Sequence, residues 1–81
     1  MTSEAELFES LKYRVGVDRH GTRRYYNSAG QLHRDDGPAV VWRDGDEEWY
    51  QNGLRHREAD PAVVWYNGDL EWYQNGLRHR I

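Results

Sequence analysis

The sequence predicts a mainly β protein in which about three tandem antiparallel β-hairpins form one small twisted sheet behind a short N-terminal capping helix. A segment recurs with a period of 23 residues, because His33, His56 and His79 follow one another at that spacing (56 − 33 = 23 and 79 − 56 = 23). Each copy holds two β-branched or aromatic runs around an Asp-Gly or Asn-Gly pair, the pattern of a hairpin. Four Trp and six Tyr, against one Phe and one Met, indicate a thin sheet stabilised by amphipathic aromatics.

The N-terminal segment has the pattern of a short helix. Ser3 and Glu6 form a capping box, and apolar residues follow at helical spacing. We therefore expect a helix over residues 3–12 whose apolar stripe covers the first hairpin, because the ends of repeat arrays need capping.

The rest of the chain divides into three units within one domain, residues 1–81. Residues 13–34 form a degenerate repeat with one extra residue between its aromatics and its glycine, followed by regular repeats over 35–57 and 58–81. The pairs Asp44-Gly45 and Asn67-Gly68 are expected to be two-residue turns, type I′ at the second. That register places Val40 opposite Trp49 and groups Val40, Trp42 and Trp49 on one face.

The segment between hairpins, residues 51–61, is expected to be an ordered connector, because its length, glycine, histidine and arginine recur. We predict that each His-Arg pair pins its connector. The imidazole bonds a backbone group of a turn, and the guanidinium stacks on an aromatic of a neighbouring unit. The alternative is that these pairs form a basic contact stripe.

Composition restricts the partners. The chain lacks cysteine, which removes disulfides and thiolate nucleophiles and suits a reducing cytoplasm. Its first ten residues have neither the basic region nor the apolar run of a signal peptide, and no transmembrane span is expected. The net charge of -3 disfavours direct binding of nucleic acid or anionic membranes and favours a partner with a basic surface.

The order Trp-Tyr-x-x-Gly-x-x-His-Arg-x-Asp-Gly-Pro-Ala, traceable from Tyr26 to Ile81, resembles the MORN-type repeats of phage and viral proteins. The second connector departs from it, with Ala59-Asp60 where the pattern has Asp-Gly. The pattern also ends at Ile81 without a further strand, which leaves the strand over 71–74 as an expected open edge. Such a resemblance implies fold more than function.

Catalysis, metals and cofactors are not expected. The recurrent histidines lie one hairpin apart, about 9 to 10 Å, whereas zinc ligands sit about 2 Å from the ion. Glu48 and Glu71 are equivalent positions of an open sheet and lack the enclosing pocket that tunes a catalytic acid. The four Trp are interpreted mainly as a structural ladder.

We therefore expect a small phage-type protein-binding module, most concretely an anti-CRISPR-like inhibitor of a host defence complex in the bacterial cytoplasm, acting by surface occlusion. The alternatives are a homo-oligomeric scaffold, such as a homodimer through the C-terminal edge strand, or a carbohydrate-, choline- or lipid-binding module. Solvated turns would equally explain the acidic residues. The partner-binding candidates are Asp35, Asp36, Asp44, Asp46, Glu47, Glu48, Glu58, Asp60, Asp69 and Glu71.

Overall fold

The computed structural model describes residues 13–80 and is all β within that range, which confirms the mainly β, antiparallel part of the predicted fold. The helix expected over 3–12 lies outside the described residues. The strands are β1 (Arg14–Val17), β2 (Arg23–Tyr26), β3 (Val40–Val41), β4 (Glu47–Glu48), β5 (Tyr50–Gln51), β6 (Leu54–Arg55), β7 (Val63–Val64), β8 (Leu70–Gln74) and β9 (Leu77–Arg80). No helix in this part of the chain is long and apolar enough to cross a membrane.

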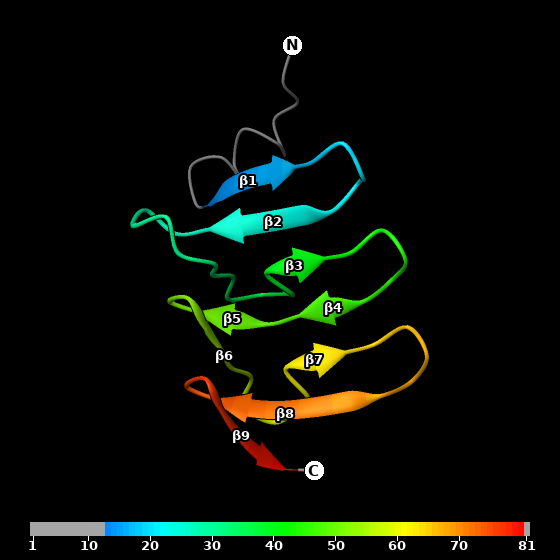
Figure 1. Ribbon diagram of the computed structural model, residues 1–81. Coiled ribbons are helices and arrows are strands. Elements are labelled where there is room, and N and C mark those ends of the chain that lie inside the picture. Colours follow the sequence, from blue (N-terminus) through cyan, green and yellow to red (C-terminus); the bar gives the residue numbers. More distant parts are fainter. Residues whose placement is uncertain (1–12, 81) are drawn as a thin grey trace.

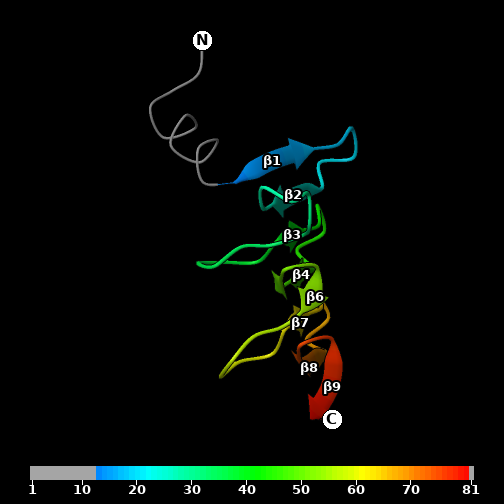
Figure 2. The same cartoon turned by 90° about the vertical axis from the view of Figure 1, so that its left-hand side faces the viewer.

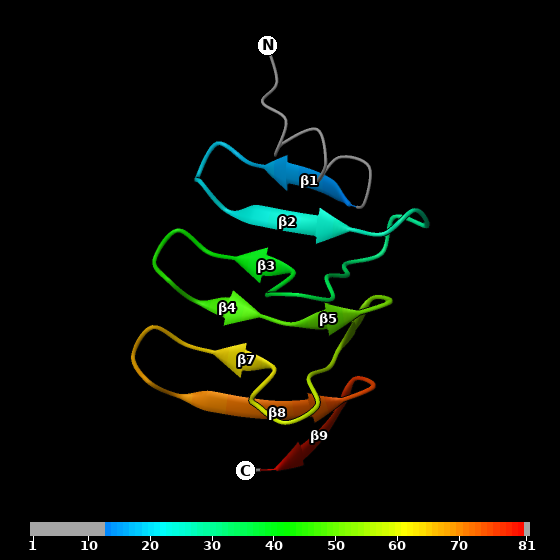
Figure 3. The ribbon, with the colours of Figure 1, turned by 180° about the vertical axis from the view of Figure 1, so that it is seen from behind.

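The strands form an antiparallel sheet in the order β1-β2-β3-β4-β7-β8-β9, with β5 and β6 as a separate pair. The hairpins β1–β2, β3–β4 and β7–β8 follow one another down the molecule in chain order (Figure 1). The same succession is visible from behind (Figure 3). In the view turned by 90°, two connecting loops project to one side of this stack (Figure 2).

The hairpin loops have three residues, so the predicted two-residue turns are wrong. Trp42 N–H donates to the carbonyl of Asp46 at 2.9 Å, and Gly45 N–H donates to the carbonyl of Trp42 at 3.0 Å. Val40 therefore lies opposite Glu48, not Trp49. Because side chains alternate along a strand, this one-residue difference brings Glu48 to the face that holds Val40 and Trp42.

The turns with two successive positive φ angles lie elsewhere, in the returns that follow the hairpins. Asn52 and Gly53 have φ angles of 50° and 84°, and Asn75 and Gly76 have 52° and 80°. These residues join β5 to β6 and β8 to β9. The connector is therefore ordered, as predicted, but it begins with a second small hairpin, which the sequence reading did not include.

The core is a narrow row of small and aromatic side chains. Tyr13, Tyr25, Ala39, Val40, Ala62 and Val63 are its buried hydrophobic residues within the described range. Tyr13 packs edge-on against Tyr25, with ring centroids 5.9 Å apart. Since burying one valine contributes only about 1.5 to 3 kcal/mol, the polar contacts between units matter unusually much for stability.

Candidate partner-binding groove

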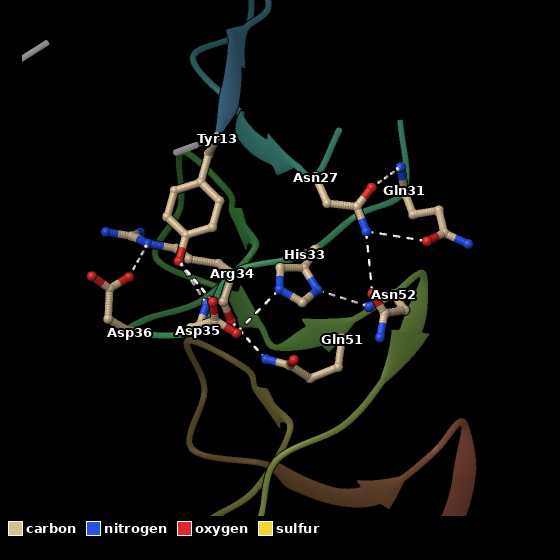
Figure 4. A network of polar contacts seen from close by, with 9 residues as sticks. All are labelled: Tyr13, Asn27, Gln31, His33, Arg34, Asp35, Asp36, Gln51 and Asn52. Carbon is tan, nitrogen blue, oxygen red and sulfur yellow. Dashed lines mark hydrogen bonds and ion pairs between the residues drawn. The ribbon is translucent and has the colours of Figure 1, made fainter. Parts of the chain in front are cut away.

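In the two His-Arg pairs whose side chains the structure describes, the histidine joins two units. His33 Nδ1 accepts the backbone N–H of Asn52 at 3.0 Å, and His56 Nδ1 accepts that of Asn75 at 3.0 Å. Since Nδ1 accepts a hydrogen bond, Nε2 carries the proton of the neutral ring. For His33, this Nε2 faces a carboxylate oxygen of Asp35 at 3.1 Å (Figure 4). These contacts confirm that the imidazole bonds a turn.

The arginine of each of these two pairs stacks on an aromatic ring. The Cζ atom of Arg34 lies 3.9 Å from the ring centroid of Tyr25, and that of Arg57 lies 3.8 Å from the ring centroid of Trp49. Stacking is thus confirmed, although each ring belongs to the arginine's own unit and not to a neighbour. Each guanidinium also donates to the carbonyl of the proline that ends the connector, at 3.3 and 3.2 Å.

The hydrogen bond from a turn N–H to the histidine Nδ1, which we call the histidine clasp, and the arginine stack together hold two projecting loops. These loops, 34–38 and 57–61, lie one repeat apart (Figure 2). Between these loops lies an open groove of about 690 Å³. Its lining comprises Asp35, Asp36, Gly37, Trp49, Gln51, His56, Arg57, Glu58, Ala59, Asp60 and Asn75. Four of the predicted partner-binding acids are therefore brought together, against one guanidinium in the lining. We call this feature the acidic groove.

The departure from the repeat pattern at Ala59-Asp60 preserves an ion pair. In the first loop, Arg34 contacts Asp36 at 3.3 Å, and a Cβ built on Gly37 would lie only 3.0 Å from the Arg34 Cζ atom. In the second loop the carboxylate stands one position later, and Arg57 contacts Asp60 at 3.6 Å. In each loop, one carboxylate therefore forms an ion pair with the arginine, but it comes from the second residue after Arg34 and from the third residue after Arg57.

Three of the other predicted acids, Asp46, Glu48 and Glu71, accept hydrogen bonds from other residues of the sheet and its loops. Glu48 is 5% exposed and accepts hydrogen bonds from Trp42 Nε1 at 2.7 Å, Tyr50 OH at 2.9 Å and Arg55 at 3.1 Å. Buried Asp46 accepts the backbone N–H of Tyr66 at 2.6 Å. Asp46 and Glu48 therefore offer no free surface to a partner.

Glu71 repeats the Glu48 arrangement with two donors, Trp65 Nε1 at 2.7 Å and Tyr73 OH at 3.0 Å. Asp44 belongs to a hairpin loop, Asp69 directly follows the next one, and Glu47 is half-buried on β4. The ten acids therefore do not form one patch, since these six lie outside the acidic groove.

The network around Glu48 shifts the titration of its neighbours. Burial, followed by the hydrogen bond to Glu48, raises the pKa of Tyr50. Burial alone would lower the pKa of Arg55, but its contacts with Tyr50 and Glu48 outweigh that effect and raise it. In the next unit, the hydrogen bond from Trp65 lowers the pKa of Glu71.

The fold and the groove together define the class of protein. It is a repeat sheet of antiparallel hairpins with acidic loops that project to one side. No protein-family model matches the sequence, and neither a curated protein nor a solved structure is significantly similar to it. In the described part of the chain, no three or more His, Cys, Asp or Glu side chains are grouped so as to hold a metal ion.

Sequence reasoning missed the uncharged part of the groove, above all Gln51 and Asn75. Gln51 Nε2 donates to the carbonyl of Arg34 at 3.0 Å, which ties the first loop to the strand beneath it (Figure 4). The available signal was the recurrence of Gln51-Asn52 as Gln74-Asn75 at the 23-residue period.

Proposed function

We propose that the protein is a binding module that recognises a basic segment of a partner protein through the acidic groove. The observation that carries the proposal is that four exposed carboxylates stand on two braced loops. The side chains of Asp35, Asp36, Glu58 and Asp60 are 57%, 64%, 81% and 64% exposed. Each therefore retains oxygen surface for a partner despite its internal contact.

Two of these carboxylates are not paired with an arginine in the ion pairs described above. Asp36 and Asp60 are paired with arginines, whereas Asp35 and Glu58 contact imidazoles whose Nδ1 atoms accept hydrogen bonds, as in the neutral tautomer. Asp35 and Glu58 are thus the main anionic groups of the groove. An arginine of a partner fits such a site because its planar guanidinium donates two parallel hydrogen bonds to a carboxylate.

Bracing matters for affinity. Each loop is fixed by the histidine clasp, the arginine stack and a bond to a proline carbonyl, so little conformational freedom remains to be lost on binding. Complementary charge also accelerates encounter and makes the association sensitive to salt.

The most concrete form of the proposal is an inhibitor of a bacterial defence complex, anti-CRISPR-like in that it occludes a surface meant for nucleic acid. RNA-guided nucleases hold their heteroduplex in a positively charged channel, which is the kind of surface an acidic module blocks. The resemblance of the sequence to phage repeats and its net charge of -3 support this form.

The test uses a defined arginine-rich peptide and isothermal titration calorimetry. We expect binding that weakens as salt rises, and at least a tenfold loss in the double variant Asp35→Asn/Glu58→Gln. That variant keeps oxygen acceptors for both histidines while removing two charges. The matched control, Asp44→Asn/Asp69→Asn, removes two charges at the hairpin ends, outside the groove, and should bind within twofold of wild type. Equal losses in both variants would overturn the groove assignment.

For the inhibitor form, RNA-guided nuclease complexes are mixed with labelled target DNA and the protein. Wild type is expected to reduce the DNA-bound fraction, and Asp35→Asn/Glu58→Gln to restore it. If the protein leaves DNA binding unchanged while the peptide still binds, the general module stands and the inhibitor form is rejected.

A further inference from the structure

Neighbouring units meet through a small set of recurring contacts. Strand β4 pairs with β7 of the next unit, Glu47 opposite Val64 and Glu48 opposite Val63. The first loop residue of each hairpin packs over the turn glycine of the preceding one, Arg43 on Gly21 and Tyr66 on Gly45.

The return turns repeat the same device in the opposite direction. Gln31 packs over Gly53, and Leu54 packs over Gly76, each side chain covering a glycine of the following unit. Main-chain bonds accompany these contacts, because Gly53 N–H and Gly76 N–H each donate at 2.8 Å to a carbonyl of the preceding unit. Each unit thus contacts the next one through the same groups, which are a strand edge, a turn glycine, a covering side chain and a backbone carbonyl.

At the C-terminal end of the described array, the corresponding contact groups have no neighbouring unit. Within residues 13–80, no strand pairs with the outer edge of Leu70 and Glu71, whereas Trp72–Gln74 are paired with β9. The open edge is therefore shorter than the expected one over 71–74. Leu70 and Leu77 are 42% and 73% exposed, and Gly68, equivalent to Gly45, has no atom within 4 Å of a built Cβ.

The N-terminal end of the described array carries the complementary contact groups. The described residues provide no strand on the outer edge of β1, where Val17 is 61% exposed. Gly16 and Gly30 have no atom within 4 Å of a built Cβ. Together with Gly68, they are the glycines of the described chain whose built Cβ meets nothing, and all three lie in the first and last units of the array.

We propose that the β1–β2 hairpin of a second copy docks on the C-terminal end of the first, which continues the array head to tail. The β4–β7 register places Val17 of the second copy opposite Leu70, so that two exposed apolar side chains meet. Gly16 of the second copy lies opposite Glu71 of the first, so no second negative charge faces that glutamate. Arg19, equivalent to Arg43 and Tyr66, covers Gly68, and Leu77 covers Gly30.

Charge disfavours the other arrangement, a two-fold dimer through the same edge. Antiparallel pairing of β8 with its own copy about Leu70 places Asp69 opposite Glu71, and like charges directly opposite destabilise a sheet. The head-to-tail contact is heterologous and does not close, so it generates open chains. The junction is small, and we expect weak association.

The test is sedimentation velocity on the full chain from about 10 µM to 1 mM. We expect the average mass to rise with concentration past that of a dimer. Val17→Lys blocks the head and Leu70→Lys blocks the tail, and both residues are exposed, so circular dichroism should show folded chains. Each variant alone should be monomeric, while an equimolar mixture should form a dimer and nothing larger, because one free tail meets one free head.

A wild-type chain that stays monomeric at 1 mM overturns the proposal. So does a Val17→Lys variant that dimerises alone, since that result indicates tail-to-tail pairing. The groove variant Asp35→Asn/Glu58→Gln should assemble like wild type, which keeps this test separate from that of partner binding.

Discussion

Replacing Glu48 by glutamine should destabilise the fold far more than a surface substitution. Its side chain is 7% exposed, and its carboxylate accepts hydrogen bonds from an indole, a phenol and a guanidinium. Glutamine has a single oxygen, and its NH₂ group turns a donor toward donors. At least one buried donor is then left without an acceptor, and Arg55 loses its counter-charge.

The magnitude follows from these losses. An unsatisfied buried donor costs about 1 to 3 kcal/mol, and a hydrogen bond to a charged group contributes about 1.5 to 3 kcal/mol. Because the amide keeps part of the network, we expect a total loss of about 2 to 4 kcal/mol. For a domain of this size that loss corresponds to a fall in Tm on the order of 10 to 25 °C.

The assay is urea denaturation followed by tryptophan fluorescence, with Glu47→Gln as control, because Glu47 lies on the opposite face of the same strand. Glu71→Gln, which removes acceptors for Trp65 Nε1 and Tyr73 OH at a less buried site, should cost about 1 to 2 kcal/mol and folds even if Glu48→Gln does not. A Glu48→Gln protein within about 0.5 kcal/mol of wild type would refute the assignment of Glu48 as an internal ligand.

Three further predictions concern the turns, the clasp and pH. His56→Ala removes the acceptor of a turn N–H and should cost about 1 to 2 kcal/mol of unfolding free energy; an unchanged Tm contradicts the clasp. Asn52→Val should cost about 1 to 2 kcal/mol because its φ is 50°, whereas Asn67→Val, outside the positive-φ set, should cost less, as urea denaturation will show. The lowered pKa of Glu71 contributes stability that is present above its ordinary value of 4.5 and is lost as pH falls through the lower folded pKa. Trp65→Phe should shrink that acid-dependent loss in a pH series of unfolding curves.

The repeat period and residue chemistry were sufficient to predict the β class and the clasp. Both follow from local requirements: a histidine recurring beside an arginine and a turn can satisfy only a few partners. The register was not determined in the same way, because Asp44-Gly45 suits both a two-residue loop and a three-residue loop with glycine last. The difference lies in the side chain of Asp44, whose carboxylate accepts the N–H of Asp46 at 3.0 Å and favours the longer loop.

Two Asn-Gly pairs illustrate why turn type needed the structure. Asn52-Gly53 and Asn67-Gly68 look alike in sequence, yet only Asn52 has positive φ. Asn67 accepts the N–H of Asp69 at 3.0 Å, as Asp44 does for Asp46. The residue two positions after the asparagine therefore separates the cases, Asp in the hairpin loop and Leu in the return turn.

The acidic groove and the two open ends occupy different parts of the same repeat, and this separation has a functional consequence. The groove requires two consecutive loops with an acid after His-Arg, and the described residues provide it between loops 34–38 and 57–61. Head-to-tail assembly leaves these loops projecting to the side and lines up one groove per copy along the array. A partner with several basic segments then binds a second groove at the effective concentration set by the array, which raises avidity without any new contact. Weak self-association and weak groove binding would thereby reinforce each other, and disrupting Val17 should reduce binding to a multivalent partner while leaving binding to a single arginine-rich peptide intact.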